Sequence, residues 1–226
     1  MLKKITAGIL LLSMSALAHA DYIVTDSEVD GSEMTGMEVT VTFADGSMDT
    51  GTWATTSMDG LIPNQEGYAG SASGQSWMLS QAGWTEGNVD GTDILGIWTL
   101  MNDSAQAITG FSIDALAGGV AFDIVFGSEV TPGSQGGKDF VAFMGNTTPA
   151  AAYTGTIATL SNQLNAAYDD LFGMLAVTFE TGSELGASAS VNFWIDTDAV
   201  QVNAPSTIGV LLMGMFLAAR LSRKKG

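Results

Sequence analysis

Apolar and polar side chains alternate along several short segments of the chain. In the clearest of them, the apolar positions are Met37, Val39, Val41 and Phe43. A period of two residues is that of a half-buried β-strand, because successive side chains point to opposite faces. The same alternation, complete or partial, predicts strands at residues 37–43, 50–56, 120–126, 175–179 and 189–195. Residues 94–101 are apolar on both faces and predict a central strand.

Gly, Ser, Thr, Asp and Asn residues separate these segments, and few stretches have helical periodicity. Many short strands with turn residues between them indicate two antiparallel sheets packed face to face. We therefore predict an all-β fold, a jelly-roll-like two-sheet β-sandwich. Residues 156–168 are the exception, because Ile157, Leu160 and Leu164 recur there at helical spacing. A short helix and a strand followed by a loop both fit this segment.

The first twenty residues have the three parts of a secretory signal peptide. Lys3 and Lys4 form a positive n-region, residues 5–17 are predominantly apolar, and Ala18 and Ala20 form a small-x-small cleavage site. We expect signal peptidase to cleave directly after this site. The alternative is an uncleaved N-terminal anchor, which the short apolar run and the cleavage site disfavour.

Near the other end, residues 208–219 are an uninterrupted apolar run. As a helix this run would span about 18 Å, which is short of the hydrocarbon core of a membrane at about 30 Å. Extended to residues 205–221, the segment approaches a transmembrane helix. A basic cluster follows, made of Arg220, Arg223, Lys224 and Lys225. Such a cluster stays on the cytoplasmic side, so we expect the body of the protein to lie outside the inner membrane.

This three-part tail resembles the PEP-CTERM sorting signal of Gram-negative bacteria, in which a short motif precedes a transmembrane helix and a basic cluster. The motif positions are Ala204, Pro205, Ser206 and Thr207, with Asn203 and Ala204 where the signal has its first Pro and its Glu. The resemblance implies that an exosortase, an integral-membrane sorting enzyme, cuts near Pro205 and releases or transfers the mature protein. It also implies a β-rich exported domain and supplies no catalytic residue. The alternative is a C-terminal membrane anchor without processing.

These features divide the chain into a signal peptide at 1–20, a secreted domain at 21–198, a linker at 199–204 and a sorting signal at 205–226. The composition of the secreted part limits its chemistry, because His19 is the only histidine and the chain has no cysteine. A Ser-His-Asp triad, a cysteine nucleophile and a zinc or iron site with His or Cys ligands are thereby excluded. Disulfides are excluded too, so burial must stabilise the domain.

The charges of the chain are unevenly distributed. All 24 acidic residues lie between Asp21 and Asp198, where Lys138 is the single basic residue. A surface of this sign repels nucleic acid and anionic lipid, so we expect no nucleic-acid partner. It keeps an exported protein soluble and attracts divalent cations.

Acidic side chains at short spacing form three candidate calcium sites, since Ca²⁺ prefers oxygen ligands. The residues are Asp26, Glu28 and Asp30, then Asp90 and Asp93, then Asp196 and Asp198. The first group resembles the opening of an EF-hand loop, although Met37 stands at the twelfth position, where a Glu belongs. Each group also has a simpler interpretation, as a solvated acidic segment, an Asx-type turn or a strand end capped by side-chain oxygens.

Three further patterns have competing interpretations. The tryptophans could stack on sugar rings or pack in the core, and core packing is favoured for Trp53, Trp77, Trp84, Trp98 and Trp194. Asp169 and Asp170 could serve as acid and base of a glycosidase, but adjacent residues point apart on a strand. Residues 102–104 and 146–148 match the acceptor pattern for N-glycosylation, which is weak support in a bacterial chain.

The two termini and the missing catalytic side chains favour a protein without enzymatic activity. We expect a precursor anchored in the inner membrane with its body in the periplasm, and a final location at the cell surface or in the extracellular matrix. The alternative is a calcium-dependent carbohydrate-binding module that binds matrix polysaccharide. A third hypothesis, a hydrolase that uses only carboxylates, requires two acids facing each other across a cleft.

Overall fold

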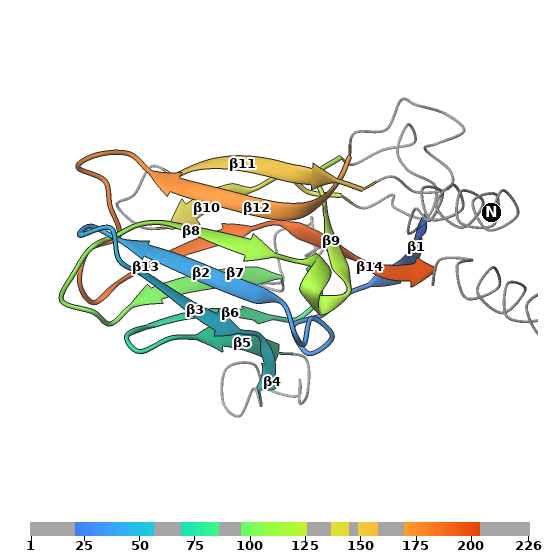
Figure 1. Cartoon of the computed structure of the whole chain (residues 1–226), viewed down its shortest axis with the longest axis horizontal. Coiled ribbons are helices and arrows are strands. Elements are labelled where there is room, and N and C mark those ends of the chain that lie inside the picture. The colour runs from blue at the N-terminus through green and yellow to red at the C-terminus, as the bar shows by residue number, and fades with distance from the viewer. Residues whose placement is uncertain are drawn as a thin grey trace, which may run out of the picture. The chain divides into compact units, whose positions relative to one another are not determined.

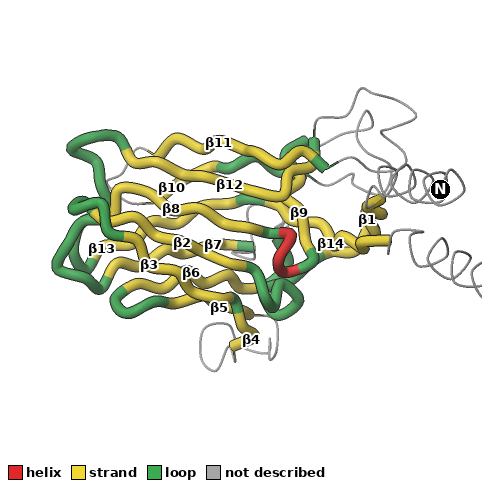
Figure 2. The backbone as a smooth tube through the Cα atoms, in the orientation of Figure 1, coloured by secondary structure: helices red, strands yellow, loops and turns green. Residues whose placement is uncertain are grey.

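The computed structural model describes residues 21–56, 69–85, 96–125, 137–144, 149–157 and 170–203. Val24–Gln201 form one compact unit, which holds the candidate site. The strands form two antiparallel sheets packed as a sandwich, with β2 and β8 in one layer and β6 and β7 in the other (Figures 1 and 2). The expected all-β sandwich is confirmed.

The two sheets are named here sheet one and sheet two. The described residues contribute eight strands to sheet one. Their order is β1 (Asp21–Glu28), β14 (Asp196–Asn203), β9 (Val120–Asp123), β12 (Leu171–Phe179), β8 (Ile108–Asp114), β2 (Glu38–Phe43) and β3 (Met48–Thr52), with β11 (Pro149–Thr156) paired to β12. In the same part of the chain, six strands form sheet two, in the order β10 (Val141–Met144), β13 (Ala189–Trp194), β7 (Ile97–Asn102), β6 (Trp77–Ala82), β5 (Ala69–Ser73) and β4 (Ala54–Thr56).

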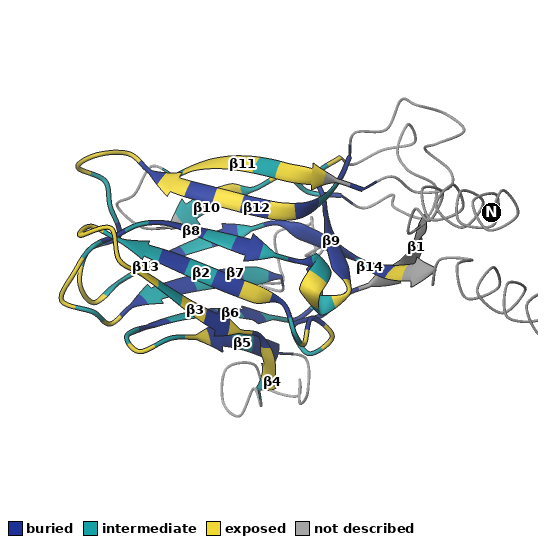
Figure 3. Cartoon of the chain, viewed as in Figure 1, coloured by how far each residue is buried: buried dark blue, intermediate teal, exposed yellow. Residues whose placement is uncertain are grey.

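The predicted alternation becomes alternation of burial in the folded strands (Figure 3). In β12, Leu175, Val177 and Phe179 are buried and the residues between them are exposed. The strands predicted at 37–43 and 189–195 correspond to β2 and β13. β7 is central in sheet two, as expected, between β13 and β6. It is fully buried on one face only, because Trp98 and Leu100 are buried whereas its outward residues are half-buried.

β8 and β9 follow one another along the same edge of β12. Asp114 of β8 pairs with Met174, and Phe122 of β9 pairs with Phe172. Between them the chain leaves the sheet in a short 3₁₀ helix, η2 (Leu116–Gly118). β2 then borders β8 on the outer side, and β14 borders β9. The strand expected at 120–126 ends at Asp123, shorter than predicted.

Among the described residues, the chain passes from one sheet to the other through a single intervening residue at two positions. Trp53 separates β3 in sheet one from β4 in sheet two, so residues 50–56 form two strands where the sequence predicted one. Ile195 separates β13 in sheet two from β14 in sheet one. Strands that switch sheets form the corners of a sandwich. The expected linker at 199–204 lies largely within β14, which extends to Asn203.

Large aromatic side chains fill the core between the sheets. The rings of Trp53 and Trp98 lie 5.3 Å apart, and Phe193 stacks on Trp98 at 5.9 Å. Trp77 is also buried, so these three tryptophans pack in the core, as favoured by the sequence. Trp194 is half-buried and stacks on Phe143 with ring centroids 3.9 Å apart.

Several expected segments lie outside the described residues. They are the signal peptide, the tail from Ala204 to Gly226, and residues 158–169 of the segment that fits either a helix or a strand and loop. The start of that last segment, Thr156, belongs to β11. Among the residues that are described, no helix is both long and apolar enough to cross a membrane.

Candidate functional site

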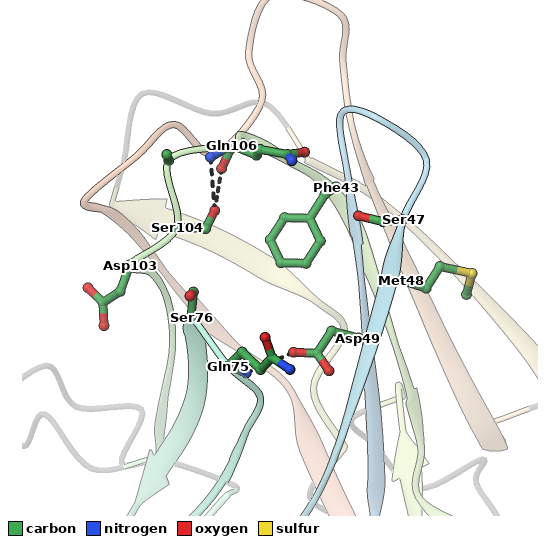
Figure 4. Close-up of a pocket in the computed structure, with 10 residues that line it drawn as sticks. Phe43, Ser47, Met48, Asp49, Gln75, Ser76, Asp103, Ser104 and Gln106 are labelled. Carbon is green, nitrogen blue, oxygen red and sulfur yellow. Dashed lines mark hydrogen bonds between the residues drawn. The ribbon is translucent and has the colours of Figure 1, made fainter.

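Three connections at one end of the sandwich surround a cleft of about 430 Å³. They are the β2–β3 turn, the β5–β6 turn and the β7–β8 loop. Figure 4 shows the Phe43 ring between the β2–β3 hairpin and the loop that carries Ser104 and Gln106. The lining residues are Phe43, Ser47, Met48, Asp49, Gln75, Ser76, Asp103, Ser104, Ala105 and Gln106. Loops held by a rigid scaffold are where binding residues concentrate in proteins.

The β2–β3 turn closes on the carboxylate of Asp45. Ser47 donates to Asp45 Oδ1 from its backbone N at 2.8 Å and from its Oγ at 2.6 Å. Gln106 Nε2 donates to Asp45 Oδ2 at 3.0 Å, which joins the turn to the β7–β8 loop. The Ser47 hydroxyl, then the Ser47 N–H and the Gln106 amide, hold the pKa of Asp45 below its ordinary value. Gly46 has a φ of 83°, the left-handed conformation that glycine adopts without strain.

Asp49 connects β3 to the β5–β6 turn. Its Oδ2 accepts hydrogen bonds from Gln75 N and from Trp77 Nε1, both at 2.9 Å. Gly74 leaves room for this contact, because a Cβ there would collide with Asp49 Oδ2 and the Trp77 indole nitrogen. A carboxylate has acceptor sites on both oxygens, so Asp49 Oδ1 is left as an acceptor for a ligand.

Asn102, the last residue of β7, holds the β7–β8 loop through hydrogen bonds from its side chain. The residue is fully buried, and its Nδ2 donates to Gln106 O at 2.8 Å and to Leu185 O at 2.8 Å. Its Oδ1 accepts from Ser104 N at 2.9 Å and from Ser104 Oγ at 2.7 Å. The Asn102 amide is therefore engaged inside the fold, which corrects the interpretation of residues 102–104 as a glycosylation acceptor. Asn146 lies outside the described residues.

The cleft is acidic and has no basic side chain. None of its ten described lining residues is Lys or Arg. Asp49 lines it, Asp45 lies directly beside it, and Asp103 stands at its edge with the carboxylate turned outward (Figure 4). The site therefore favours neutral or cationic groups over anions.

The arrangement is suited to binding more than to acid–base chemistry. Asp45 and Asp49 both accept hydrogen bonds that hold loops in place, and the low pKa of Asp45 keeps it ionised. A general acid in a glycosidase needs the opposite, a raised pKa. The serine hydroxyls of the cleft have no imidazole beside them, because the single histidine of the chain is His19.

Comparison with known proteins gives no match. No protein-family model matches the chain, and neither a curated protein nor a solved structure is significantly similar to it. The candidate site therefore stands on its own geometry.

Of the first predicted calcium group, Asp26, Glu28 and Asp30, the structure describes only the side chain of Asp30. Asp26 and Glu28 lie in β1, and their side chains are outside the described part. Asp30 is buried, and its Oδ1 accepts from Ser32 N at 2.7 Å and from Ser32 Oγ at 2.6 Å. Asp30 thus forms an Asx-type turn in the folded chain. Asp90 and Asp93, the second group, lie outside the described residues.

The third predicted group begins a strand instead of ending one. Asp196 and Asp198 are buried on β14, and Asp196 pairs across the sheet with Asp123 of β9, which is also buried. Thr85 Oγ1 donates to Asp196 Oδ1 at 3.0 Å, and Thr197 N donates to Thr85 Oγ1 at 3.2 Å. These contacts attach the segment after β6 to the first residues of β14.

Among the residues that the structure describes, no group of three or more His, Cys, Asp or Glu side chains is placed to hold a metal ion. The calcium sites therefore stay predictions. Of the acid pair considered for a hydrolase, Asp170 is buried and Asp169 lies outside the described part.

The cleft is not visible in the sequence, because its residues belong to three separate turns that look like ordinary solvent-exposed connections. One local signal was available. Asp30-x-Ser32, Asp45-x-Ser47 and Asn102-x-Ser104 share a spacing, and in each the Ser N–H and Oγ both bond to the Asx Oδ1. Two of these three turns border the cleft, so the Asx-x-Ser pattern is present at two of its three walls and also at one turn elsewhere.

Proposed function

We propose that this chain is an exported surface or extracellular-matrix protein without catalytic activity, sorted through its C-terminal signal. An exosortase-type enzyme processes it near Pro205. One observation carries this proposal: every described strand, from β1 to β14, lies between the two expected cleavage sites. Cleavage after Ala20 and near Pro205 would therefore leave every described strand whole. Neither expected cleavage would cut within the described part of the sandwich.

The chemistry of the cleft supports the non-catalytic part of the proposal. Its carboxylates serve as hydrogen-bond acceptors that hold the loops, and the mature chain has neither imidazole nor thiol. The finer expectations stay predictions: a jelly-roll-like connection of the strands, a helix at each end of the precursor, and calcium as a ligand.

Mass spectrometry of the protein recovered from its native cell surface tests the processing. We expect an N-terminus at Asp21 and a C-terminus near Pro205. A surface-located form that retains Gly226 would contradict processing at the motif and would favour a plain membrane anchor.

The topology is tested with a reporter inserted between Thr181 and Gly182. Both residues are exposed in the turn after β12, and Gly182 has a φ of 87°, so an insertion there disturbs no strand. We expect the reporter to be active outside the inner membrane. A cytosolic reporter in a correctly folded fusion would refute export of the body.

A further inference from the structure

The cleft between the β2–β3, β5–β6 and β7–β8 connections is suited to binding a small ligand. Its volume of about 430 Å³ falls within the range of small-molecule pockets. All its lining residues belong to the compact unit Val24–Gln201. None of the described residues that line the cleft is a predicted calcium ligand.

The walls of the cleft are fixed before any ligand arrives. Asp49 holds the β5–β6 turn through Gln75 N, and Asp45 holds the Gln106 amide at 3.0 Å. Buried Asn102 holds the β7–β8 loop through Ser104. Rigid walls reduce the entropy lost on binding, so such a site binds a small ligand better than mobile loops would.

The groups that face the cleft are of two kinds. Gln75, Gln106 and Asp49 offer planar amide and carboxylate groups, with at least one donor or acceptor left on each. Phe43 presents a half-buried aromatic ring among them (Figure 4). Planar polar groups bond to pairs of neighbouring hydroxyls, whereas an aromatic ring packs on the C–H face of a pyranose. This combination is complementary to a sugar.

The charge of the site selects among sugars. None of the described residues that line the cleft is basic, and the whole segment from Asp21 to Asp198 carries one lysine against 24 acidic residues. A uronic acid or a sulfated sugar would be repelled both by the cleft and by the surface around it. We propose that the cleft is a binding site for a neutral saccharide, and that binding there is independent of calcium. This inference goes beyond export and sorting, and its test is independent of both.

Isothermal titration calorimetry of the full chain in detergent tests the proposal. The probes are maltotriose, cellotriose and chitotriose as neutral trisaccharides, trigalacturonic acid as the anionic one, and trilysine as a cation. We expect at least one neutral trisaccharide to bind with or without EDTA, and trigalacturonic acid not to bind. The proposal is overturned if no neutral probe binds at about 10 mM, since a Kd above that leaves little binding free energy. Binding of trilysine alone, or saccharide binding that EDTA abolishes, would also overturn it.

A matched pair of variants locates the binding. Gln75→Ala removes an exposed amide that lines the cleft, and Gln201→Ala removes an exposed amide on β14 outside it. We expect Gln75→Ala to weaken binding by at least about tenfold and Gln201→Ala to leave it unchanged. Both substitutions are at the surface, so melting temperatures should match that of the unsubstituted protein. Equal affinity in both variants would place the saccharide elsewhere and refute the cleft assignment.

Discussion

The indoles of Trp53 and Trp98 lie 5.3 Å apart at the centre of the sandwich, and each donates its N–H to a backbone carbonyl close to a corner of the fold. Trp98 Nε1 donates to Ile195 O at 3.1 Å, where the chain passes from β13 to β14. Trp53, itself the residue between β3 and β4, donates from Nε1 to Gly31 O at 2.7 Å. One aromatic pair therefore stabilises the two described positions at which a single residue joins a strand of one sheet to a strand of the other.

Trp98→Phe tests this role. Phenylalanine keeps an aromatic ring but leaves a void and removes the donor to Ile195 O. We expect the free energy of unfolding to fall by about 2 to 4 kcal/mol, from lost packing and a buried carbonyl left without its partner. Urea denaturation followed by circular dichroism measures it. The control, Thr99→Ala, changes the other face of β7 and should cost less than about 1 kcal/mol. Equal stability of Trp98→Phe and the control would contradict the role of the indole.

Gly70→Ala tests the other half of the pair. A Cβ at Gly70 would collide with Gly31 O and Trp53 Nε1, the two atoms of the second indole hydrogen bond. We expect a loss of about 1 to 3 kcal/mol in the free energy of unfolding, as for other overpacked cores.

The control for this substitution is Gly186→Ala. Nothing lies within 4 Å of a Cβ at Gly186, so this variant should be neutral or more stable by up to about 1 kcal/mol. If the Gly70→Ala and Gly186→Ala proteins had the same melting temperature, the backbone at Gly70 would accommodate a Cβ without loss of stability, and the prediction would be wrong.

Strands with large apolar residues on one face could be predicted, as for β2, β12 and β13. β5, Ala-Gly-Ser-Ala-Ser, could not, because its residues are too small to show an apolar face. Its burial results from what packs on it, including the Trp53 indole beside Gly70. The change from sheet one to sheet two at Trp53 could not be predicted from the local sequence either, because the alternation of side chains does not show which sheet a strand joins.

The candidate site could not be predicted from local sequence either, but for a different reason. Each of its walls is a turn whose chemistry is visible locally, as Asp45-x-Ser47 and Asn102-x-Ser104 show. What brings the turns together is the pairing of strands, and a link such as that between Asp45 and Gln106 spans 61 positions of the chain. Long-range pairing has no signature in a short window of sequence.

Asn102→Asp tests whether the β7–β8 loop depends on its buried amide. The substitution keeps the shape but puts an oxygen where Nδ2 now donates to the carbonyls of Gln106, Leu185 and Gly186 at 2.8, 2.8 and 3.1 Å. A buried charge facing three carbonyl oxygens should lower the free energy of unfolding at pH 7 by at least about 3 kcal/mol. Thermal unfolding measures the loss.

Ser104→Ala is the matched control for this loop. It removes the Ser104 hydroxyl, which lies 2.7 Å from Asn102 Oδ1 and 2.6 Å from Gln106 O and accepts from Gln106 N at 3.1 Å. It leaves the three hydrogen bonds of Asn102 Nδ2 in place and should cost about 1 to 2 kcal/mol. If Asn102→Asp were no less stable than Ser104→Ala, the Asn102 amide of the unsubstituted protein would not make its three hydrogen bonds to carbonyl oxygens in solution.

The Asp45 carboxylate should titrate below its ordinary pKa of 3.8, because the Ser47 hydroxyl, the Ser47 N–H and the Gln106 amide all donate to it. A carboxyl whose pKa is lower in the folded than in the unfolded chain contributes stability above the unfolded pKa. That contribution is lost as the pH falls through the folded pKa. The contribution of the Asp45 carboxylate to the β2–β3 turn should therefore decline progressively as the pH falls through 3.8 and below, and carbon-detected NMR of the carboxyl group should give a midpoint under that value.

Ser47→Ala removes the largest cause of the lowered pKa and should move the Asp45 midpoint upward, toward 3.8. Glu184 is an internal control, because its pKa is lowered by the backbone N–H of Gly182 and not by Ser47. Its midpoint should stay the same in the variant, since Gly182 N still donates to Glu184 Oε2 at 2.9 Å. If the Asp45 midpoint failed to rise, the Ser47 hydroxyl would not hold the carboxylate, and the cleft wall would lack the hydrogen bond that closes its first turn.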